Sequence, residues 1–483
     1  MADRLTAREA IAALTTDFTE SAEPSGATGS AESAAPAGTT TSPVTHTPGP
    51  HGAPDRGPAA DGPLDWSGYA DSRARATART GEQESVVHGT ATVGGRTCVL
   101  ISFEFGFLGG SLGQRTGDRL EAAYEEATVK RLPLVSLIAT GGSRMQEGMI
   151  ALTQLHRVAR ASARLRAAGP AQLAVLRDPT TGGGWATLGA GADVILALPG
   201  AQVGFAGSRV RPAGADPGAY TAEGQLTAGQ IDAVVPPGEL AATVGHWLRL
   251  LAHRDTPPAP APVPAAFTTR GLPGTGWDAV LRARSADRPH AEAYLNAYFG
   301  LRLPLSGDRC GGTDPGLLCG FGLHEGEPVA YVAQCGTATR PAGYRTAARV
   351  IRLADRLGVP VLTLVDTPGA ANDAEAERAG AGAAIADAFA AVAAAGVPVT
   401  TLVIGEGGSG GALALAAPDN THVTADSYFS VIAPELAAAI LKRTPDRVHA
   451  TADQLRLRPQ DLVDLGVARS VVRSVVRADR PRP

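Results

Sequence analysis

Short apolar runs recur along the chain in two pairs, and glycine follows each run closely. Continuous apolar runs of this length, bounded by turn residues, predict buried strands. A longer stretch with helical character separates the two runs of each pair. Strand, glycine turn, helix and strand is the pattern of a β-α-β unit. We expect strands near 132–140, 172–177, 359–366 and 397–404, with helices over 144–168 and 374–395.

The two pairs resemble each other, which indicates an internal repeat and predicts two α/β domains of the same kind. Two stretches without apolar periodicity divide the chain. One is almost wholly Ser, Thr, Ala, Gly and Pro and cannot bury enough apolar surface to offset its ordering entropy, and the other is rich in proline. We therefore expect an N-terminal helix over 1–19, a disordered linker over 20–62, a first domain over 63–255, a proline-rich linker over 256–267 and a second domain over 268–483.

Composition narrows the class of protein. The 483 residues are 44% hydrophobic, which allows two or three well-packed domains, and the net charge is only −4. Because the basic residues are scattered, we expect neither nucleic acid nor a membrane surface as a partner. No apolar run approaches the ~18 residues of a membrane span, and the first residues lack the apolar segment of a secretory signal. The four cysteines show no CxxC spacing, which favours a reducing cytoplasm.

The glycine turns are the candidate chemistry of the first half. A strand that ends in Gly-Gly and enters a helix leaves unpaired backbone N–H groups at the positive end of the helix dipole. Two such turns, Gly141-Gly142 and Gly182-Gly183-Gly184, can form a two-donor oxyanion hole for a thioester enolate, at roughly 3 kcal/mol of transition-state stabilisation per donor. The alternative is that these glycines only permit tight packing of helix on strand.

The turn over 405–411 matches two other motifs. Its glycines fit the dinucleotide pattern G-x-G-x-x-G, but Asp426 is too early for a ribose contact, and the turn lies late in the chain. Ser409 fits the G-x-S-x-G nucleophile elbow, but His422 follows too soon and His449 is the only later histidine. We find no nucleophile–base pair and no metal-ligand spacing. A sequence without these groups is expected for an enzyme that only stabilises an enolate and receives its base from a co-substrate.

Several motifs resemble the carboxyltransferase of acetyl-CoA carboxylase. The segments 103–113, 141–148, 178–183 and 204–210 resemble its β subunit, and 366–370, 404–412 and 428–435 resemble its α subunit. The resemblance covers about 85–250 and 275–475, in β-then-α order. It implies two tandem crotonase-like domains (ClpP/crotonase superfamily) of ββα superhelical type. It also implies a homodimer or higher homo-oligomer, with each active site at the contact between a β-type and an α-type domain.

The resemblance implies a reaction of fatty acid or polyketide biosynthesis. Carboxybiotin releases CO2, the biotin ureido anion removes a proton from the α-carbon of acetyl-CoA, and the enolate attacks CO2 to give malonyl-CoA. The acyl-CoA would lie mainly on the first half and carboxybiotin mainly on the second. The chain shows neither an ATP-grasp domain nor a Met-Lys-Met biotinyl site, so biotin carboxylase and the biotin carboxyl carrier protein would be separate partners.

By position, the resemblance assigns catalytic amides to both halves: Gly141, Gly142, Gly182 and Gly183 for the acyl group, and Gly407 and Gly408 for biotin. It assigns substrate contacts to Gly109, Gly110, Ser111, Arg144, Gly184, Trp185, Phe205, Ala206 and Gly207 in the first half, and to Gly369, Ala370, Asp373, Gly410 and Gly411 in the second. Arg144, Gln146 and Glu147 have capping and packing of a helix start as their alternative. Asp366, Ser409 and Glu435 are expected to be structural.

The chain also departs from the family. It has no cysteine before Cys98, so the zinc ribbon that commonly begins the β subunit is missing. Asp373 replaces a glycine of the α-subunit pattern, and the basic loop near 334–344 is short, with only Arg340 and Arg345. Trp185 stands at a position of small residues, where it either reshapes the acyl pocket or packs as an ordinary aromatic.

Two other functions stay open at this point. One is a biotin-independent malonyl-thioester decarboxylase that uses the same enolate hole. The other is a non-catalytic homologue that acts as a scaffold or regulator, which Asp373 and the short loop motivate. The sequence fixes neither the acyl chain length nor the carrier of the acyl group, CoA or acyl-carrier protein.

Overall fold

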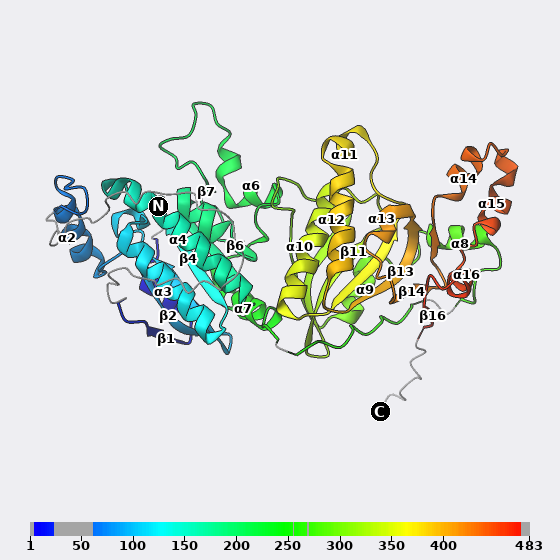
Figure 1. Ribbon diagram of the computed structural model, residues 1–483, viewed down its shortest axis with the longest axis horizontal. Coiled ribbons are helices and arrows are strands. Elements are labelled where there is room, and N and C mark those ends of the chain that lie inside the picture. Colours follow the sequence, from blue (N-terminus) through cyan, green and yellow to red (C-terminus); the bar gives the residue numbers. More distant parts are fainter. Residues whose placement is uncertain (1–3, 24–60, 255, 268–269, 475–483) are drawn as a thin grey trace, which may run out of the picture.

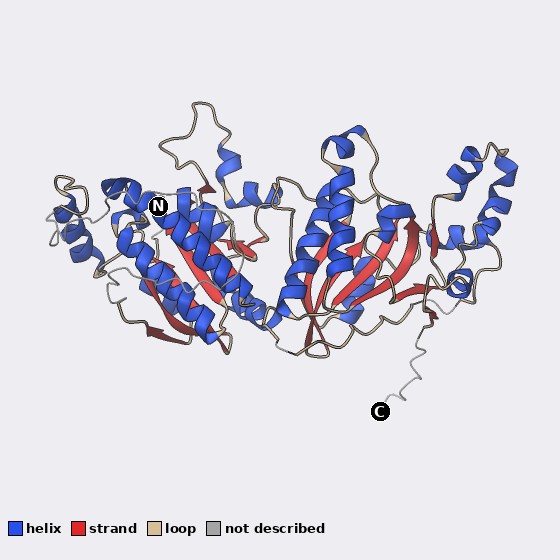
Figure 2. Ribbon diagram, viewed as in Figure 1, coloured by secondary structure: helices blue, strands red, loops and turns tan. Residues whose placement is uncertain are grey.

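The computed structural model describes residues 4–23, 61–254, 256–267 and 270–474. Two α/β halves lie next to each other along the longest axis of the molecule (Figure 1). Each half holds one sheet with helices packed on it (Figure 2). Residues 24–60, which make up most of the expected linker over 20–62, lie outside the described part of the chain.

The first sheet has eight strands in the order β1-β2-β3-β4-β5-β6-β8, with β7 paired to the end of β5. The strands β1, β2 and β3 are antiparallel, and pairing is parallel from β3 onward. The carboxyl ends of the parallel strands therefore meet at one edge. The bounds are β1 (Asp17–Glu20), β2 (Val86–Val93), β3 (Arg96–Phe103), β4 (Leu134–Thr140), β5 (Gln172–Thr181), β6 (Val194–Ala197), β7 (Val203–Gly204) and β8 (Ala233–Val234).

The second sheet repeats this plan in the order β16-β14-β13-β12-β11-β10-β9, with β15 paired to the end of β13. Its strands β9, β10 and β11 are antiparallel, and the others pair in parallel. The internal repeat read from the sequence is thus a repeat of topology. The bounds are β9 (Leu301–Pro304), β10 (Leu317–His324), β11 (Glu327–Gln334), β12 (Val361–Thr367), β13 (Val399–Gly408), β14 (Thr421–Thr424), β15 (Tyr428–Ser430) and β16 (Ser470–Val472).

The helices form where apolar residues recur every three or four positions. In the longest helix of the second half, buried Ala347, Val350, Ile351 and Ala354 face the sheet, and Gly358 ends the helix at a φ of +69°. The helices of the first half are α1 (Ala7–Leu14), α2 (Tyr69–Thr80), α3 (Gln114–Lys130), α4 (Gly148–Ala167), α5 (Gly182–Gly184), α6 (Ala222–Thr227) and α7 (Pro237–Leu250). Those of the second are α8 (Gly276–Ala283), α9 (Ala291–Tyr298), α10 (Pro341–Leu357), α11 (Ala374–Arg378), α12 (Ala381–Ala394), α13 (Ser409–Leu413), α14 (Pro434–Ile440), α15 (Val448–Gln454) and α16 (Pro459–Asp464).

The N-terminal segment contains a helix and also a strand that the sequence did not reveal. Thr6 caps α1 in a capping box with Glu9, and the helix ends at Leu14. Strand β1 follows and pairs antiparallel with β2, from Asp17 opposite Thr92 to Glu20 opposite Gly89. Four residues with a single aromatic give too little alternation to predict a strand, and the pairing with β2 stabilises it.

The two halves are joined through a buried aspartate. The carboxylate of Asp232 accepts hydrogen bonds from the N–H groups of Ile195 and Ser306 at 2.8 and 3.1 Å, and it pairs with Arg309 and Arg349 of the second half. The Asp232 side chain is fully buried. Backbone contact is also close, because a Cβ at Gly307 would lie 2.1 Å from Gly229 Cα. The contact between the halves is therefore closely packed, and it combines this polar cluster with an apolar core that continues from the first half into the second.

Within the described ranges, the structure contains no helix with the length and apolar character needed to cross a bilayer.

We predict that Asp232→Ala destabilises the protein by about 3–5 kcal/mol, because it leaves two arginines without their buried counter-charge. The melting temperature from calorimetry measures this. The matched control is Arg352→Ala, which breaks an exposed pair with Asp387 and should cost below about 1 kcal/mol. Equal melting temperatures for the two variants would contradict the account of this contact.

Candidate active site

The two glycine turns of the first half touch each other. They follow β4 and β5, which are parallel neighbours with Ile138 opposite Leu176 and Thr140 opposite Thr180. A Cβ at Gly182 would lie 2.9 Å from Gly142 Cα, and these two glycines have φ values of +64° and +107°. Both the space and the backbone conformation therefore require glycine.

Two further predicted segments meet these turns. The Gly141 N–H donates to Gly109 O at 2.9 Å, and a Cβ at Gly110 would lie 2.1 Å from Ala139 O. On the other side, the Gly182 N–H donates to Phe205 O at 3.1 Å, and Gly207 lies beside Thr181. The structure thus brings 109–111, 141–142, 182–184 and 205–207 together at one edge of the sheet.

The backbone amides of these turns differ in what they can offer a ligand. Those of Gly141 and Gly182 donate to the carbonyls just described, and that of Gly142 donates to Thr140 Oγ1 at 3.0 Å. These bonds favour a structural role for the three residues. Gly183 and Gly184 lie in the first turn of α5, where N–H groups have no intrahelical acceptor. The amides at this helix start are the best placed to bind an oxyanion.

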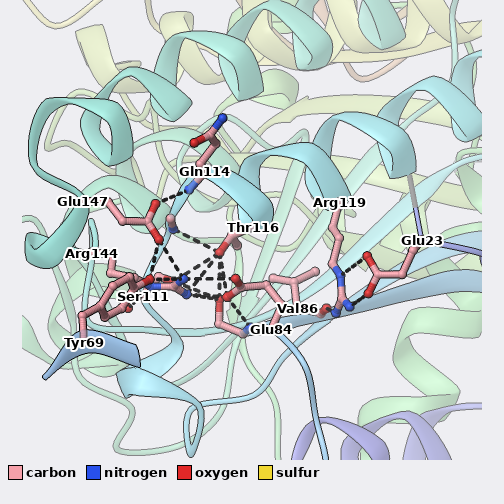
Figure 3. Close-up of polar contacts among 12 residues, drawn as sticks. Glu23, Tyr69, Glu84, Val86, Ser111, Gln114, Thr116, Arg119, Arg144 and Glu147 are labelled. Carbon is pink, nitrogen blue, oxygen red and sulfur yellow. Dashed lines mark hydrogen bonds and ion pairs between the residues drawn. The ribbon is translucent and has the colours of Figure 1, made fainter. Parts of the chain in front are cut away.

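Arg144 lies in a buried polar network rather than in an open pocket (Figure 3). Its guanidinium donates to Glu84 Oε2 at 3.0 Å and to Ser111 O at 2.8 Å, and it pairs with Glu147 at 3.2 Å. Tyr69 Oη accepts a further bond at 3.2 Å. These contacts favour the packing role that was the alternative for Arg144, because its guanidinium is bonded to protein groups and caps no helix.

Glu147 and Glu84 complete this network. Glu147 Oε2 accepts the N–H of Gln114, the first residue of α3, at 2.5 Å, so this carboxylate caps a neighbouring helix. Burial acts to raise the pKa of Glu84, but the hydrogen bonds and charge of Arg144 outweigh it and lower that pKa. Glu84 and Tyr69 could not be identified from sequence patterns, because only the fold brings them to Arg144.

The aromatic residues assigned to the first-half pocket lie in different environments. The Trp185 side chain is buried in the core with Leu188, and a Cβ at Gly189 would lie 2.6 Å from its ring. This burial supports its reading as an ordinary packed aromatic. Phe205, in contrast, is 72% exposed beside the Gly182 turn, where it can meet a ligand or another chain.

The second half repeats the paired turns. Thr367 lies opposite Gly407 at the ends of β12 and β13. A Cβ at Gly408 would lie 2.0 Å from Pro368 O, and one at Gly411 would lie 2.3 Å from Ala370 N. A Cβ at Gly410 meets nothing within 4 Å. Gly410 and Gly411 are the second and third residues of α13, as Gly183 and Gly184 are of α5, and Gly411 packs against Gly369 and Ala370.

The structure supports neither the dinucleotide-binding motif nor the nucleophile elbow over 405–411. Gly405, Gly407 and Gly408 lie within strand β13, not in a turn that cradles a dinucleotide. Ser409 has a φ of +58°, as a nucleophile elbow would. However, the ring of His422 contacts Ser470 and Asn420, and His449 stacks on Trp277 with ring centroids 4.6 Å apart. Neither contact involves Ser409.

The acidic residues of the second half have structural partners. Asp366 is buried against Arg288 at 2.6 Å, and burial raises its pKa. Asp373 is exposed and caps α11 by accepting the N–H groups of Glu375 and Ala376, each at 2.9 Å; the bond from Ala376 leads the causes that lower its pKa. It also pairs with Arg340 at 3.3 Å. Across the described residues, no cluster of three or more His, Cys, Asp or Glu could hold a metal ion.

Both halves of the chain match family models of carboxyltransferases. A family model described as "Carboxyl transferase domain" matches residues 63–256, and one described as "Acetyl co-enzyme A carboxylase carboxyltransferase-like" matches 274–481. The chain is 40% identical over 439 residues to the acetyl-coenzyme A carboxylase carboxyl transferase subunits beta/alpha of Saccharopolyspora erythraea, covering 85% of this chain and 76% of that protein. It is 34% identical over 415 residues to a probable biotin-dependent acyl-coenzyme A carboxylase beta3 subunit of Mycobacterium bovis, covering 84% and 83%.

Solved structures share the fold. The crystal structure of transcarboxylase 12S aligns with a TM-score of 0.73 at 20% identity, over 97% of this chain and 86% of that one. A single-chain, multi-domain long-chain acyl-CoA carboxylase aligns with a TM-score of 0.71 at 21% identity, over 97% of this chain and 45% of that one. The expected pair of tandem crotonase-like α/β domains is therefore confirmed.

We predict that Glu84→Gln destabilises the protein at neutral pH and does so less as the pH falls. Because the folded-state pKa of Glu84 is below its ordinary value of 4.5, its contribution is present above about pH 4.5 and is lost as the pH falls through the folded pKa. Near pH 7 we expect a loss of about 3–5 kcal/mol, since a buried ion pair loses its anion.

Melting temperatures of Glu84→Gln and the parent chain between pH 3.5 and pH 7 test this. The control is Glu327→Gln, an exposed carboxylate paired with Arg254, which should change stability by less than about 1 kcal/mol. If the difference in melting temperature between Glu84→Gln and the parent chain stays constant over this pH range, the lowered pKa of Glu84 is refuted.

Proposed function

This chain belongs to the acetyl-CoA carboxylase carboxyltransferase family, and we propose that it moves a carboxyl group from carboxybiotin to the α-carbon of a short acyl-CoA. Acetyl-CoA is the proposed acceptor and malonyl-CoA the proposed product. The observation that carries the proposal is the match of both family models and of the beta/alpha relatives over both halves, each half with paired glycine turns. Biotin carboxylase and the biotin carboxyl carrier protein would be separate partners in the cytoplasm.

The chain's own contribution would be electrostatic. Backbone amides at the start of α5 would bind the thioester oxygen while negative charge develops on it, at roughly 3 kcal/mol per donor. Those at the start of α13 would bind the biotin carbonyl oxygen. Carboxybiotin, brought by its carrier, supplies the carboxyl group and the ureido base. The engagement of Arg144, Asp366 and Asp373 in structural contacts is consistent with a site that lacks a side-chain base.

Apolar surfaces beside the two half-sites favour a homodimer. Met145, Met149 and Leu152 are exposed by 76%, 68% and 45% next to the turns of the first half. In the second half, Leu436 and Ile440 of α14 are exposed by 56% and 70%. We propose that a second copy covers both surfaces and places a first-half turn opposite a second-half turn, as the family resemblance implies.

The dimer proposal predicts that Ile440→Asp weakens self-association, because it places a charge in an apolar contact. Light scattering after size-exclusion chromatography should show a larger monomer fraction, and carboxyl transfer should fall with it. Phe389→Asp, at a 38% exposed position on α12, is the matched control. A parent chain that is monomeric yet fully active would contradict the dimer.

Two observations bear on the alternative functions. Asp373, the departure that motivates a non-catalytic scaffold, is accounted for as a helix cap that pairs with Arg340. A biotin-independent malonyl-thioester decarboxylase would need only the first-half amides. Release of CO2 from malonyl-CoA by the purified chain, without biotin, would favour that function over carboxyl transfer.

The test of the proposed function is transfer from carboxylated biotin to a panel of acyl-CoA and acyl-carrier-protein thioesters, read by mass spectrometry. We predict malonyl-CoA from acetyl-CoA, and a roughly hundred-fold loss of turnover in Gly410→Val, whose side chain would occupy the open space in front of α13. The melting temperature should not change.

The control for this variant is Gly382→Val, which also enters open space but lies on α12. Gly408 is a poor choice, because a Cβ there would meet the Pro368 carbonyl and strain the backbone. No transfer to any thioester by the parent chain would refute the proposed function, and normal turnover in Gly410→Val would refute the second-half site.

A further inference from the structure

The hydroxyl of Tyr69 contacts the side chains of Arg144 and Glu147 in the first half (Figure 3). Tyr69 is the first residue of α2, and its side chain is almost fully buried. Its Oη donates to Glu147 Oε1 at 2.5 Å and accepts from Arg144 Nη1 at 3.2 Å. Burial raises the pKa of Tyr69 to about 12, so the phenol keeps its proton at neutral pH.

Glu147 and Arg144 also form hydrogen bonds with the loop before α3. Glu147 Oε2 accepts the N–H of Gln114 at 2.5 Å, and Arg144 Nη2 donates to Ser111 O at 2.8 Å. Gly113 lies between them without room for a side chain, because a Cβ there would be 2.5 Å from Glu147 Oε1. Tyr69 therefore contacts the two side chains by which the turn over 144–147 holds the loop over 111–114.

The same loop reaches the glycine turns through the backbone. The Arg144 N–H donates to Leu112 O, and the Leu112 N–H donates to Gly142 O, each at 2.9 Å. Gly142 in turn touches Gly182, the residue before Gly183. A continuous series of hydrogen bonds and contacts thus runs from the Tyr69 hydroxyl to the start of α5.

We propose that Tyr69 is a positioning residue of the acyl-thioester site: its hydroxyl fixes the turn over 144–147 and the loop over 111–114, and through them the spacing of the Gly142 and Gly182 turns. The inference rests on the proposed function, because carboxyl transfer to acetyl-CoA requires the first-half turns to bind a thioester. Small displacements at a reacting centre are costly, so the loss of one buried hydroxyl should register in kinetics.

The test is Tyr69→Phe, which keeps the ring and removes only the hydroxyl. Because the hydroxyl acts on the site only through Arg144 and Glu147, we expect kcat/KM for acetyl-CoA to fall roughly ten-fold. The KM for carboxylated biotin should stay within about two-fold, because the second-half turns are untouched. A purely structural role would lower the melting temperature without separating the two substrates.

The matched control is Tyr124→Phe, another buried tyrosine of the same half, on α3, whose pKa burial also raises. It should lose stability comparably and keep its kinetic constants. The proposal is overturned if Tyr69→Phe matches the parent chain in kcat/KM, or if Tyr124→Phe shows the same kinetic loss.

Calorimetric binding of acetyl-CoA keeps this inference separate from the proposed function. If the parent chain binds acetyl-CoA but transfers no carboxyl group, carboxyl transfer fails as a function. A roughly ten-fold weaker Kd in Tyr69→Phe alone would then still support Tyr69 as a positioning residue. A parent chain that binds no acetyl-CoA would overturn the Tyr69 proposal.

Discussion

The close approach of two backbone turns at the ends of neighbouring parallel strands is the constraint on which the rest of the structure depends. In the first half Gly142 meets Gly182, and in the second Gly408 meets the carbonyl of Pro368. No side chain fits between these turns, so the short helices α5 and α13 begin directly beside them with their first amides unpaired within the helix. Each sheet therefore ends beside a helix start, which we propose as an anion-binding position, and the side chains around this position differ between the two halves.

The side chains near these turns hold the backbone in place. Arg144 is neutralised by two buried carboxylates, Asp366 by Arg288, and Asp373 by a helix start and Arg340. These charged side chains are bonded to protein partners that hold the loops in place, so they are not available to bind a substrate. This arrangement suits a reaction whose base arrives with a co-substrate, and it explains why a search of the sequence for a nucleophile and its base finds no pair.

Much of the fold could be read from the sequence, because buried strands and glycine turns leave local signals. The four central strands and the internal repeat follow from apolar runs and their spacing, and the motifs located every segment that converges on the first-half turns. Strand β1 could not be found, since four mostly polar residues become a strand only by pairing with β2. Nor could the partners of Arg144, because Glu84 and Tyr69 are 60 and 75 residues away in the chain. Coordinates were also needed to tell the Gly141 amide, which donates to Gly109 O, from the Gly183 amide, which lies in the first turn of a helix.

A crystal structure of the chain with a non-hydrolysable malonyl-CoA analogue would show whether main-chain N–H groups receive the negative charge. We expect the thioester oxygen within hydrogen-bond distance of an amide at the start of α5, with Gly141 and Gly142 still bonded to Gly109 and Thr140. A thioester oxygen bound instead by an arginine or a histidine, with the α5 amides facing solvent or protein carbonyls, would contradict it.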